Sequence, residues 1–353
     1  MRKTYIRAAS CISAQNTLAA DGFLTDIREY TGTRLNAIEP DYKNYIDPKQ
    51  IRRMSHVIKM GVAAAQDCLN QAEGSNPDAI TAGTALGCLE DTATFLSRIV
   101  EMNEEMLPPT AFIQSTHNTV AAQVALMLGN HGYNNTFVHK GVSFENALTD
   151  ALMLINEGEA NSVLAGGIDE LTDTSFTILT RLGLYKRKPV SNLKLYDDTQ
   201  SKGSIAGEGA AFFLLTGNAS VDNMVELKAV KTFYNPVDTL AVETQVRKFL
   251  TGQRTSIENI DLIISGKNGD IKNDAVYNSL EGSVFKDKAQ AVYKHLSGEY
   301  PTSTAFALWL AANCIKRQEV PSIVSDTPVQ PKNILIYNHY QNFYHSLMLV
   351  TVC

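Results

Sequence analysis

The chain lacks the features of an exported, zinc-binding or membrane-spanning protein. Its 353 residues include only five cysteines, and they are widely spaced without any C-x-x-C pair: Cys11, Cys68, Cys88, Cys314 and Cys353. This argues against both a disulfide framework and a zinc site. No run reaches the ~18 apolar residues of a membrane span, and no apolar segment follows the cationic start as in a signal peptide. We expect reduced thiols, a cytoplasmic location, no metal and no membrane span.

Signals for nucleic acid and for nucleotides are also missing. Acidic residues outnumber basic ones, 37 to 31, and no stretch concentrates the basic residues, so DNA and RNA are excluded as expected partners. The glycine-rich segments 83–87 and 203–209 complete neither a dinucleotide-binding nor a P-loop motif. No Gly-x-Ser-x-Gly elbow and no His-Glu-x-x-His motif occurs. The sequence therefore predicts no cofactor.

What is present is an alternation of apolar strands and amphipathic helices. An apolar content of 44% with 19% charged residues is typical of a globular chain. The periodicity predicts helices at 52–71, 119–128, 144–157, 238–250 and 303–316, and strands at 79–86, 136–138, 162–167, 209–215, 225–234, 260–265, 333–337 and 346–352. Such an order predicts an α/β fold with covered sheets. The polar segment 216–222 suggests two related halves, 1–218 and 219–353.

Five motifs in order resemble the β-ketoacyl synthases of the thiolase superfamily. They are the Arg-Arg-Met segment at 51–55 with the helix that follows, Asn118 with 121–122, the segment 158–161, the Ala-Gly-Gly strand end at 165–167, and Gly-Glu-Gly-Ala at 207–211. The resemblance implies a five-layered αβαβα thiolase-like fold of two related halves. Segments 83–91, 109–119 and 133–141 further resemble the synthase-like proteins of flexirubin and aryl-polyene gene clusters.

The positions that carry catalysis in this family hold other residues here. The resemblance places Gly141 at the nucleophilic cysteine, Ser265 at the first histidine and Glu299 at the second. Lys294 matches a family lysine, and we expect it to form an ion pair with Glu299. Condensation needs a thiolate and donors for the enolate and the oxyanion. We therefore expect no catalytic residue and no intrinsic condensing activity.

The resemblance then implies a catalytically silent subunit of the chain-length-factor type. Such a subunit pairs with an active ketosynthase in fatty-acid or polyketide-like synthesis, and meets the acyl chain of an acyl carrier protein through that partner. The expected dimer interface contains Phe112, Gln114, His117 and Asn118. The loop at 338–345 has no glycine where active synthases carry a glycine-rich gate, so we expect it to be stiff.

Two alternatives stay open at this stage. One is an active 3-oxoacyl-carrier-protein synthase or acyltransferase with a displaced nucleophile, either Ser143 or Cys88, although serine at a helix start is more often a cap. His117 and His139 invite catalytic roles, but each lacks a paired acid or nucleophile nearby in sequence. The other alternative is a homodimeric acyl-binding scaffold.

Overall fold

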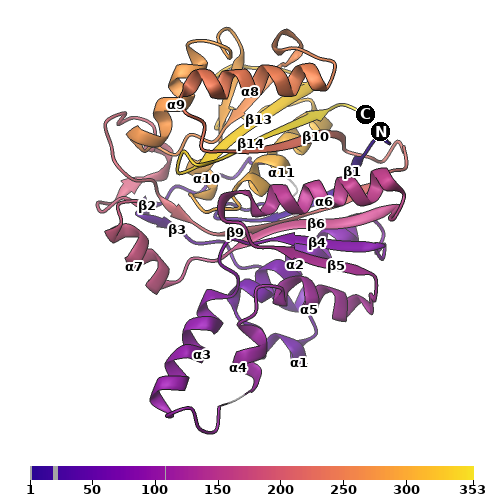
Figure 1. Cartoon of the computed structure of the whole chain (residues 1–353), viewed down its shortest axis with the longest axis vertical. Coiled ribbons are helices and arrows are strands. Elements are labelled where there is room, and N and C mark those ends of the chain that lie inside the picture. Colours follow the sequence, from indigo (N-terminus) through magenta and orange to yellow (C-terminus); the bar gives the residue numbers. More distant parts are fainter. Residues whose placement is uncertain (1, 19–22, 108) are drawn as a thin grey trace.

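The computed structural model describes residues 2–18, 23–107 and 109–353, which form alternating layers of helix and sheet (Figure 1). From one side to the other these are α8 (Thr239–Gly252) with α9 (Ile271–Glu281), five strands, α6 (Ser143–Glu157) with α11 (Thr304–Arg317), five strands, and α2 (His56–Gln71) with α5 (Thr119–Leu128). This is the expected five-layered α/β fold. In the described ranges no helix is both long enough and apolar enough to span a membrane.

The two groups of five strands have the same order. The first runs β1 (Tyr5–Ile12), β9 (Gly209–Thr216), β6 (Ser162–Asp169), β4 (Ala79–Gly83), β5 (Tyr133–Phe137). The second runs β10 (Val225–Tyr234), β14 (Tyr344–Thr351), β13 (Asn333–Tyr340), β11 (Leu262–Ser265), β12 (Ala289–Val292). In each, the fourth strand is parallel to both of its neighbours and the other pairings are antiparallel. The repeat is therefore one of topology.

The two groups join into one ten-stranded sheet. Tyr5 and Ile6 of β1 pair with Glu226 and Val225 of β10. The predicted division at 218/219 falls between the end of β9 and the start of β10, and as a domain boundary it stays a prediction.

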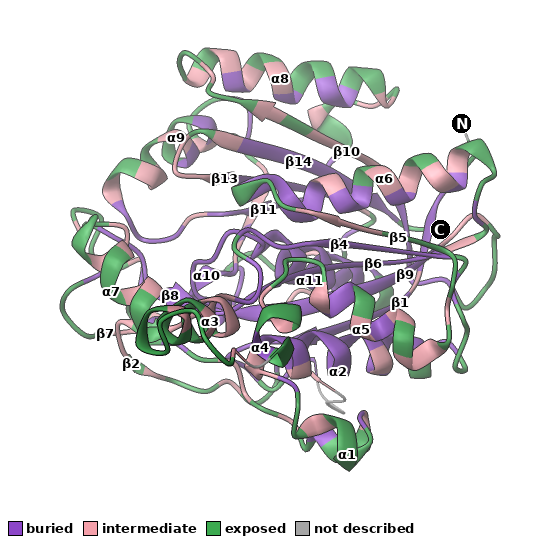
Figure 2. Cartoon of the chain, turned by 60° about the horizontal axis from the view of Figure 1, so that its bottom comes forward, coloured by how far each residue is buried: buried purple, intermediate pink, exposed green. Residues whose placement is uncertain are grey.

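The middle layer forms the largest hydrophobic core. Helix α11 is buried along nearly its whole length, whereas α6 buries the stripe Phe144, Leu148, Ala151 and Ile155. The spacing of four, three and four residues places these four side chains on one helical face. Figure 2 shows buried and exposed residues alternating along α6, and α8 exposed on its outer side. Burial of each large apolar side chain contributes about 1.5–3 kcal/mol.

The remaining elements are short or lie outside the layers. They are α1 (Pro48–Ile51), α3 (Leu89–Glu101), α4 (Pro109–Gln114), α7 (Asp173–Arg181), α10 (Lys294–Ser297), β2 (Thr31–Gly32) paired with β7 (Val190–Ser191), and β3 (Arg34–Leu35) paired with β8 (Ala206–Gly207). The helix predicted at 52–71 begins only at His56, because Ser55 is extended at its N-cap. Helices α3 and α4 project from the body as an arm (Figure 1).

Candidate functional site

The turn that follows β5 is tightly built around Gly141. Lys140 has a φ of 48°, which is unusual for a residue with a side chain. The hydroxyl of Ser143 donates to the Lys140 carbonyl at 2.8 Å and accepts the His139 N–H at 2.7 Å. Ser143 is fully buried, and both hydrogen bonds of its hydroxyl close the turn. The side chain thus acts as a local backbone clamp.

The space beside Gly141 is occupied by Tyr340. A Cβ atom added at Gly141 would overlap the Cβ of Tyr340 and would lie 2.8 Å from its Cγ. A side chain at position 141 is therefore excluded while Tyr340 keeps its place. The resemblance predicts the nucleophile at this position; the residue is a glycine, and Tyr340 leaves no room for a side chain.

The hairpin that carries Tyr340 is held by the His339 ring. Nε2 of His339 lies 2.9 Å from the Asn273 carbonyl, and Nδ1 accepts the Asn342 N–H at 3.1 Å. The ring stacks on Tyr277 at 4.6 Å. Burial lowers the pKa of His339 well below its usual value, so the ring is neutral and one nitrogen donates while the other accepts.

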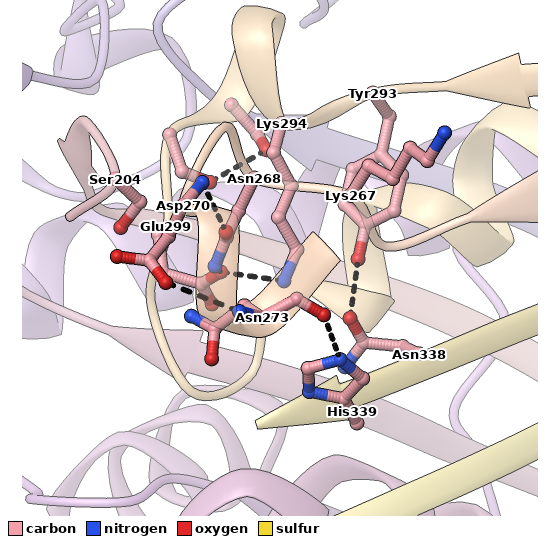
Figure 3. A network of polar contacts seen from close by, with 12 residues as sticks. Ser204, Lys267, Asn268, Asp270, Asn273, Tyr293, Lys294, Glu299, Asn338 and His339 are labelled. Atoms are coloured by element: carbon pink, nitrogen blue, oxygen red, sulfur yellow. Dashed lines mark hydrogen bonds and ion pairs between the residues drawn. The ribbon is translucent and has the colours of Figure 1, made fainter. Parts of the chain in front are cut away.

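Lys294 and Glu299 form a buried ion pair. Lys294 Nζ is 2.6 Å from Glu299 Oε2, and the two side chains are 1% and 8% exposed. Asn268 donates its amide to the same oxygen at 2.6 Å (Figure 3). The pair expected from the sequence forms, and its members neutralise each other inside the protein.

Ser265, which the resemblance aligns with the first histidine of the family, is the last residue of β11. The hydroxyl of Ser265 accepts the Lys267 N–H at 3.4 Å, a long local hydrogen bond. Nearby, Asn338 of β13 accepts the hydroxyl of Tyr293 at 3.3 Å (Figure 3). Gly141, Ser265 and Glu299 lie around the carboxyl end of β13, but among the described residues no hydrogen bond or ion pair joins them to one another.

The two alternative reactive residues differ in their surroundings. Cys88 is 1% exposed, and burial raises the pKa of its thiol to about 12, so it is protonated at neutral pH. His139 is exposed, with Nδ1 at 3.2 Å from the Asn146 amide and its ring edge-on to Tyr344. Within the described ranges, no hydrogen bond or ion pair joins Cys88 or His139 to Lys294.

The predicted interface residues lie on the arm and just after it. Phe112 is 56% exposed and packs on Phe95 at 5.4 Å. The Gln114 side chain donates to the Arg53 carbonyl, and His117 and Asn118 are exposed before α5.

The sequence match decides the family. Residues 27–219, more than half of the chain, match the family described as "Beta-ketoacyl synthase, N-terminal domain". The chain belongs to the β-ketoacyl synthase family.

Curated members of the β-ketoacyl synthase family match over 188 residues. One is 3-oxoacyl-[acyl-carrier-protein] synthase 2 of Synechocystis sp., 25% identical over 50% of this chain and 44% of the relative. The enzyme of the same name from Staphylococcus aureus (strain N315) is 20% identical over 49% of this chain and 44% of its own length. The match therefore spans less than half of the length of these relatives.

Solved structures of β-ketoacyl synthases and their assemblies share the fold. The ishigamide ketosynthase/chain length factor gives a TM-score of 0.82 at 15% identity, over 100% of this chain and 99% of that chain. A β-ketoacyl synthase from Burkholderia phymatum gives 0.83 at 14%, over 100% of both chains. A ketosynthase in complex with its chain length factor, from Xenorhabdus doucetiae, gives 0.79 at 16%, over 100% and 98%.

Glu145, close to the turn at Gly141, is a buried polar residue that the sequence analysis did not predict. Glu145 is 0% exposed, neither carboxylate oxygen has a hydrogen-bond partner among the described residues, and burial raises its pKa to about 7. An acidic residue in a first helical turn is ordinary in a sequence, because the helix dipole favours it. Only the fold shows that this one points inward.

Proposed function

We propose that this chain is a non-condensing subunit of the chain-length-factor type, which pairs with an active ketosynthase in fatty-acid or polyketide-type synthesis. The contact of Gly141 with Tyr340 carries the proposal. On the resemblance of three segments, the finer proposal is a pathway to flexirubins or aryl polyenes.

The chemistry supports a silent site. Decarboxylative condensation needs a thiolate to hold the acyl chain and donors for the developing negative charge. Gly141 offers no thiol, Lys294 is neutralised by Glu299, and the Ser143 hydroxyl is committed to the turn. Each missing function costs orders of magnitude in rate, so their joint absence leaves no route to turnover.

An open sheet edge supports a partner of the same fold. Strand β5 pairs with β4 on one side, and within the described ranges no strand covers its other side. Its sequence has no charge, which leaves the edge free to pair with another strand. The neighbouring arm exposes apolar side chains: Leu96, Val100, Met106, Phe112 and Ile113. We infer that the ketosynthase covers this edge and arm.

A small cavity lies between the helices α2 and α5 and the strands β4, β5 and β6. It is lined in part by Cys88, His117, Ala121 and Thr136. Behind the proposed interface, side chains here can shape the end of the partner's acyl tunnel and so limit chain length.

A basic pocket supports contact with an acyl carrier protein. It has a volume of about 570 Å³ and is lined in part by Lys186, Arg187, Lys188, Lys202 and Asp198. This concentration of positive charge contrasts with the net charge of −6 of the chain. A carrier with an acidic surface and a phosphate-linked arm complements it.

The decisive experiment compares the isolated chain with a co-expressed ketosynthase from the same gene neighbourhood. We expect the two to co-purify, and the isolated chain to show no malonyl-carrier decarboxylation or acyl transfer above a heat-denatured control. Turnover by the isolated chain that disappears in Ser143→Ala or Cys88→Ala would overturn the proposal. A stable homodimer that ignores the ketosynthase would instead indicate the scaffold alternative.

Product length tests the role of the cavity. Ala121→Leu adds bulk to the cavity wall, so the pair should release shorter chains. Ala122→Leu, an exposed neighbour on α5, is the matched control and should leave product length unchanged. The tunnel role is wrong if the two variants give the same products.

A further inference from the structure

An acidic pocket lies at the base of the arm that α3 and α4 form (Figure 1). It has a volume of about 620 Å³, and its walls include the segment after β3, the start of α2, the first two turns of α3 and the start of α7. Five carboxyl groups line it, those of Glu39, Glu90, Glu170, Asp173 and Glu208, together with two basic side chains, Arg34 and His56. When all of these groups are ionised, the pocket carries three negative charges more than positive ones.

Both basic side chains of the pocket are already paired. The His56 ring lies 3.0 Å from Glu39 and 3.1 Å from Glu208, so each of its nitrogens is engaged by a carboxylate. The Arg34 guanidinium pairs with Asp173 at 2.5 Å. Neither basic group is therefore free to neutralise the other carboxyl groups of the pocket.

The Glu170 carboxyl group is recessed in the pocket and has no cation of its own. It is 7% exposed, and its Oε1 accepts the Glu90 N–H at 3.0 Å. Within the described ranges its Oε2 makes no hydrogen bond, and neither Glu170 nor Glu90 forms an ion pair. A buried charge without a partner is strongly disfavoured, and burial accordingly raises the pKa of Glu170 to about 7. A cation that entered the pocket would remove this penalty.

The arrangement favours an organic cation over a metal ion. Among the described residues, no three His, Cys, Asp or Glu side chains are placed to hold a metal ion together. Glu90 lies at the exposed rim, whereas Glu170 lies deeper, so a cationic group on a long stem reaches both. Lysine and arginine side chains have such a stem, and they bury it along a wall while their charged end finds a carboxylate.

The pocket adjoins the apolar side of α3. Ala93 lines the pocket, and Leu96 and Val100 follow it by three and seven residues, which places all three on one helical face. The side chains of Leu96 and Val100 are exposed. A protein that covers this face therefore reaches the pocket as well. The inference rests here on the proposed function, in which the ketosynthase covers the arm.

We propose that the pocket receives a lysine or arginine side chain of the ketosynthase, whose cationic group pairs with Glu170 and Glu90. A charge pair that is shielded from water fixes the position of a partner and disfavours partners that lack the charge. The pocket would thus set the register of the ketosynthase on the arm, and would select one with a basic side chain at that place.

The whole chain without a partner tests whether the pocket binds a cation. The probe is n-butylammonium, and n-butanol, which has the same apolar stem without the charge, is its control. In amide NMR spectra the signals of 90–94 and 170–174 should shift with n-butylammonium alone, and Glu170→Gln should weaken its binding about tenfold. Equal responses to the two probes, or equal binding by Glu170→Gln, would overturn the proposal.

Association with the ketosynthase tests the source of the cation. Glu170→Gln should weaken association about tenfold or more, and Glu90→Gln, at an exposed position where the fold is not at risk, about threefold. Glu101→Gln removes the same charge at the far end of α3, outside the pocket, and is the matched control.

The outcomes separate this inference from the proposed function. Equal weakening by all three variants would show a general attraction between charged surfaces and would overturn the role of the pocket. Unchanged association of Glu170→Gln, with the cation probe still bound by the natural chain, would mean that the ketosynthase does not supply the cation. If the natural chain did not associate with the ketosynthase at all, the proposed function itself would be wrong.

Discussion

The two halves of the chain share one strand order but treat their sheet edges differently. In the second half, β12 is also an edge strand, but its last residue, Val292, donates its N–H to the Val324 carbonyl at 2.9 Å. In the first half, β5 is open and is flanked by the exposed arm. The strand ends differ too: the second half holds a buried ion pair there, whereas in the first half Tyr340 occupies the space beside Gly141. The second half is therefore filled by its own side chains, whereas the first half exposes an edge that another protein can contact.

The largest expected effect comes from the ion pair of the second half. Lys294→Met leaves Glu299 buried without its partner and should lower the free energy of unfolding by about 3–5 kcal/mol. The control Lys267→Met breaks the more exposed pair with Glu281, whose side chains are 18% and 28% exposed, and should cost about 1 kcal/mol or less. Denaturant unfolding measures both. Equal losses would mean that Lys294 and Glu299 are not a desolvated pair.

A smaller effect is expected at the turn around Gly141 in the first half. Gly141→Ala places a methyl group against Tyr340 and should cost about 1–3 kcal/mol of unfolding free energy. Tyr340→Gly should offset part of the loss in a double variant, because it removes the clashing atoms. Gly252→Ala at the end of α8 is the control, since nothing lies within 4 Å of its added Cβ. If Gly141→Ala and Gly252→Ala lowered the melting temperature equally, Tyr340 would not be packed tightly against Gly141.

The two edges can be compared directly by placing one charge on each. Asn135→Lys on β5 should weaken association with the partner about tenfold or more, which corresponds to about 1.4 kcal/mol. Gln290→Lys on the other edge strand, β12, should leave association unchanged. Sedimentation velocity over a range of concentrations measures both. If Gln290→Lys were the more damaging change, the interface would lie at the other edge.

The smallest effect concerns the outer layer of the first half. His56 bridges Glu39 at 3.0 Å and Glu208 at 3.1 Å, and its hydrogen bond to Glu208 raises its pKa to about 9. The stabilisation is complete below the unfolded pKa of ~6.5 and is lost as the pH rises through about 9. For this partly exposed group we expect about 1 kcal/mol. In His56→Asn, the free energy of unfolding measured with urea should fall less as the pH rises through about 9. An unchanged dependence of this free energy on pH would contradict the prediction.

Elements with strong periodicity could be predicted from the sequence. The buried stripe of α6 and the apolar run of β6 lie within a residue or two of their expected positions. Helix α3 could not, because none of its residues is buried in this chain and its apolar side faces outward. Its apolar side is not buried by the described residues, whereas the sequence rules assume an internal core.

The site was predictable where it depends on short separations. Lys294 and Glu299 are five residues apart, and their opposite charges predicted the ion pair. That Gly141 stands at the nucleophile position rests on the family resemblance and stays a prediction. The contact of Gly141 with Tyr340 joins residues 199 positions apart, so no local pattern encodes it. The burial of Glu145 could not be predicted for a related reason, because the direction of a polar side chain depends on which layers enclose the helix.

Strand β1 has a consequence for the order of folding. It holds a central place in the ten-stranded sheet, between β9 and β10, although it precedes every other described strand in the chain. Tyr5 pairs with Thr216 and with Glu226, so its neighbours emerge from the ribosome more than 200 residues later. Contacts of such long separation form slowly. The junction of the two halves should therefore close late, and until then an apolar strand stays exposed in the nascent chain.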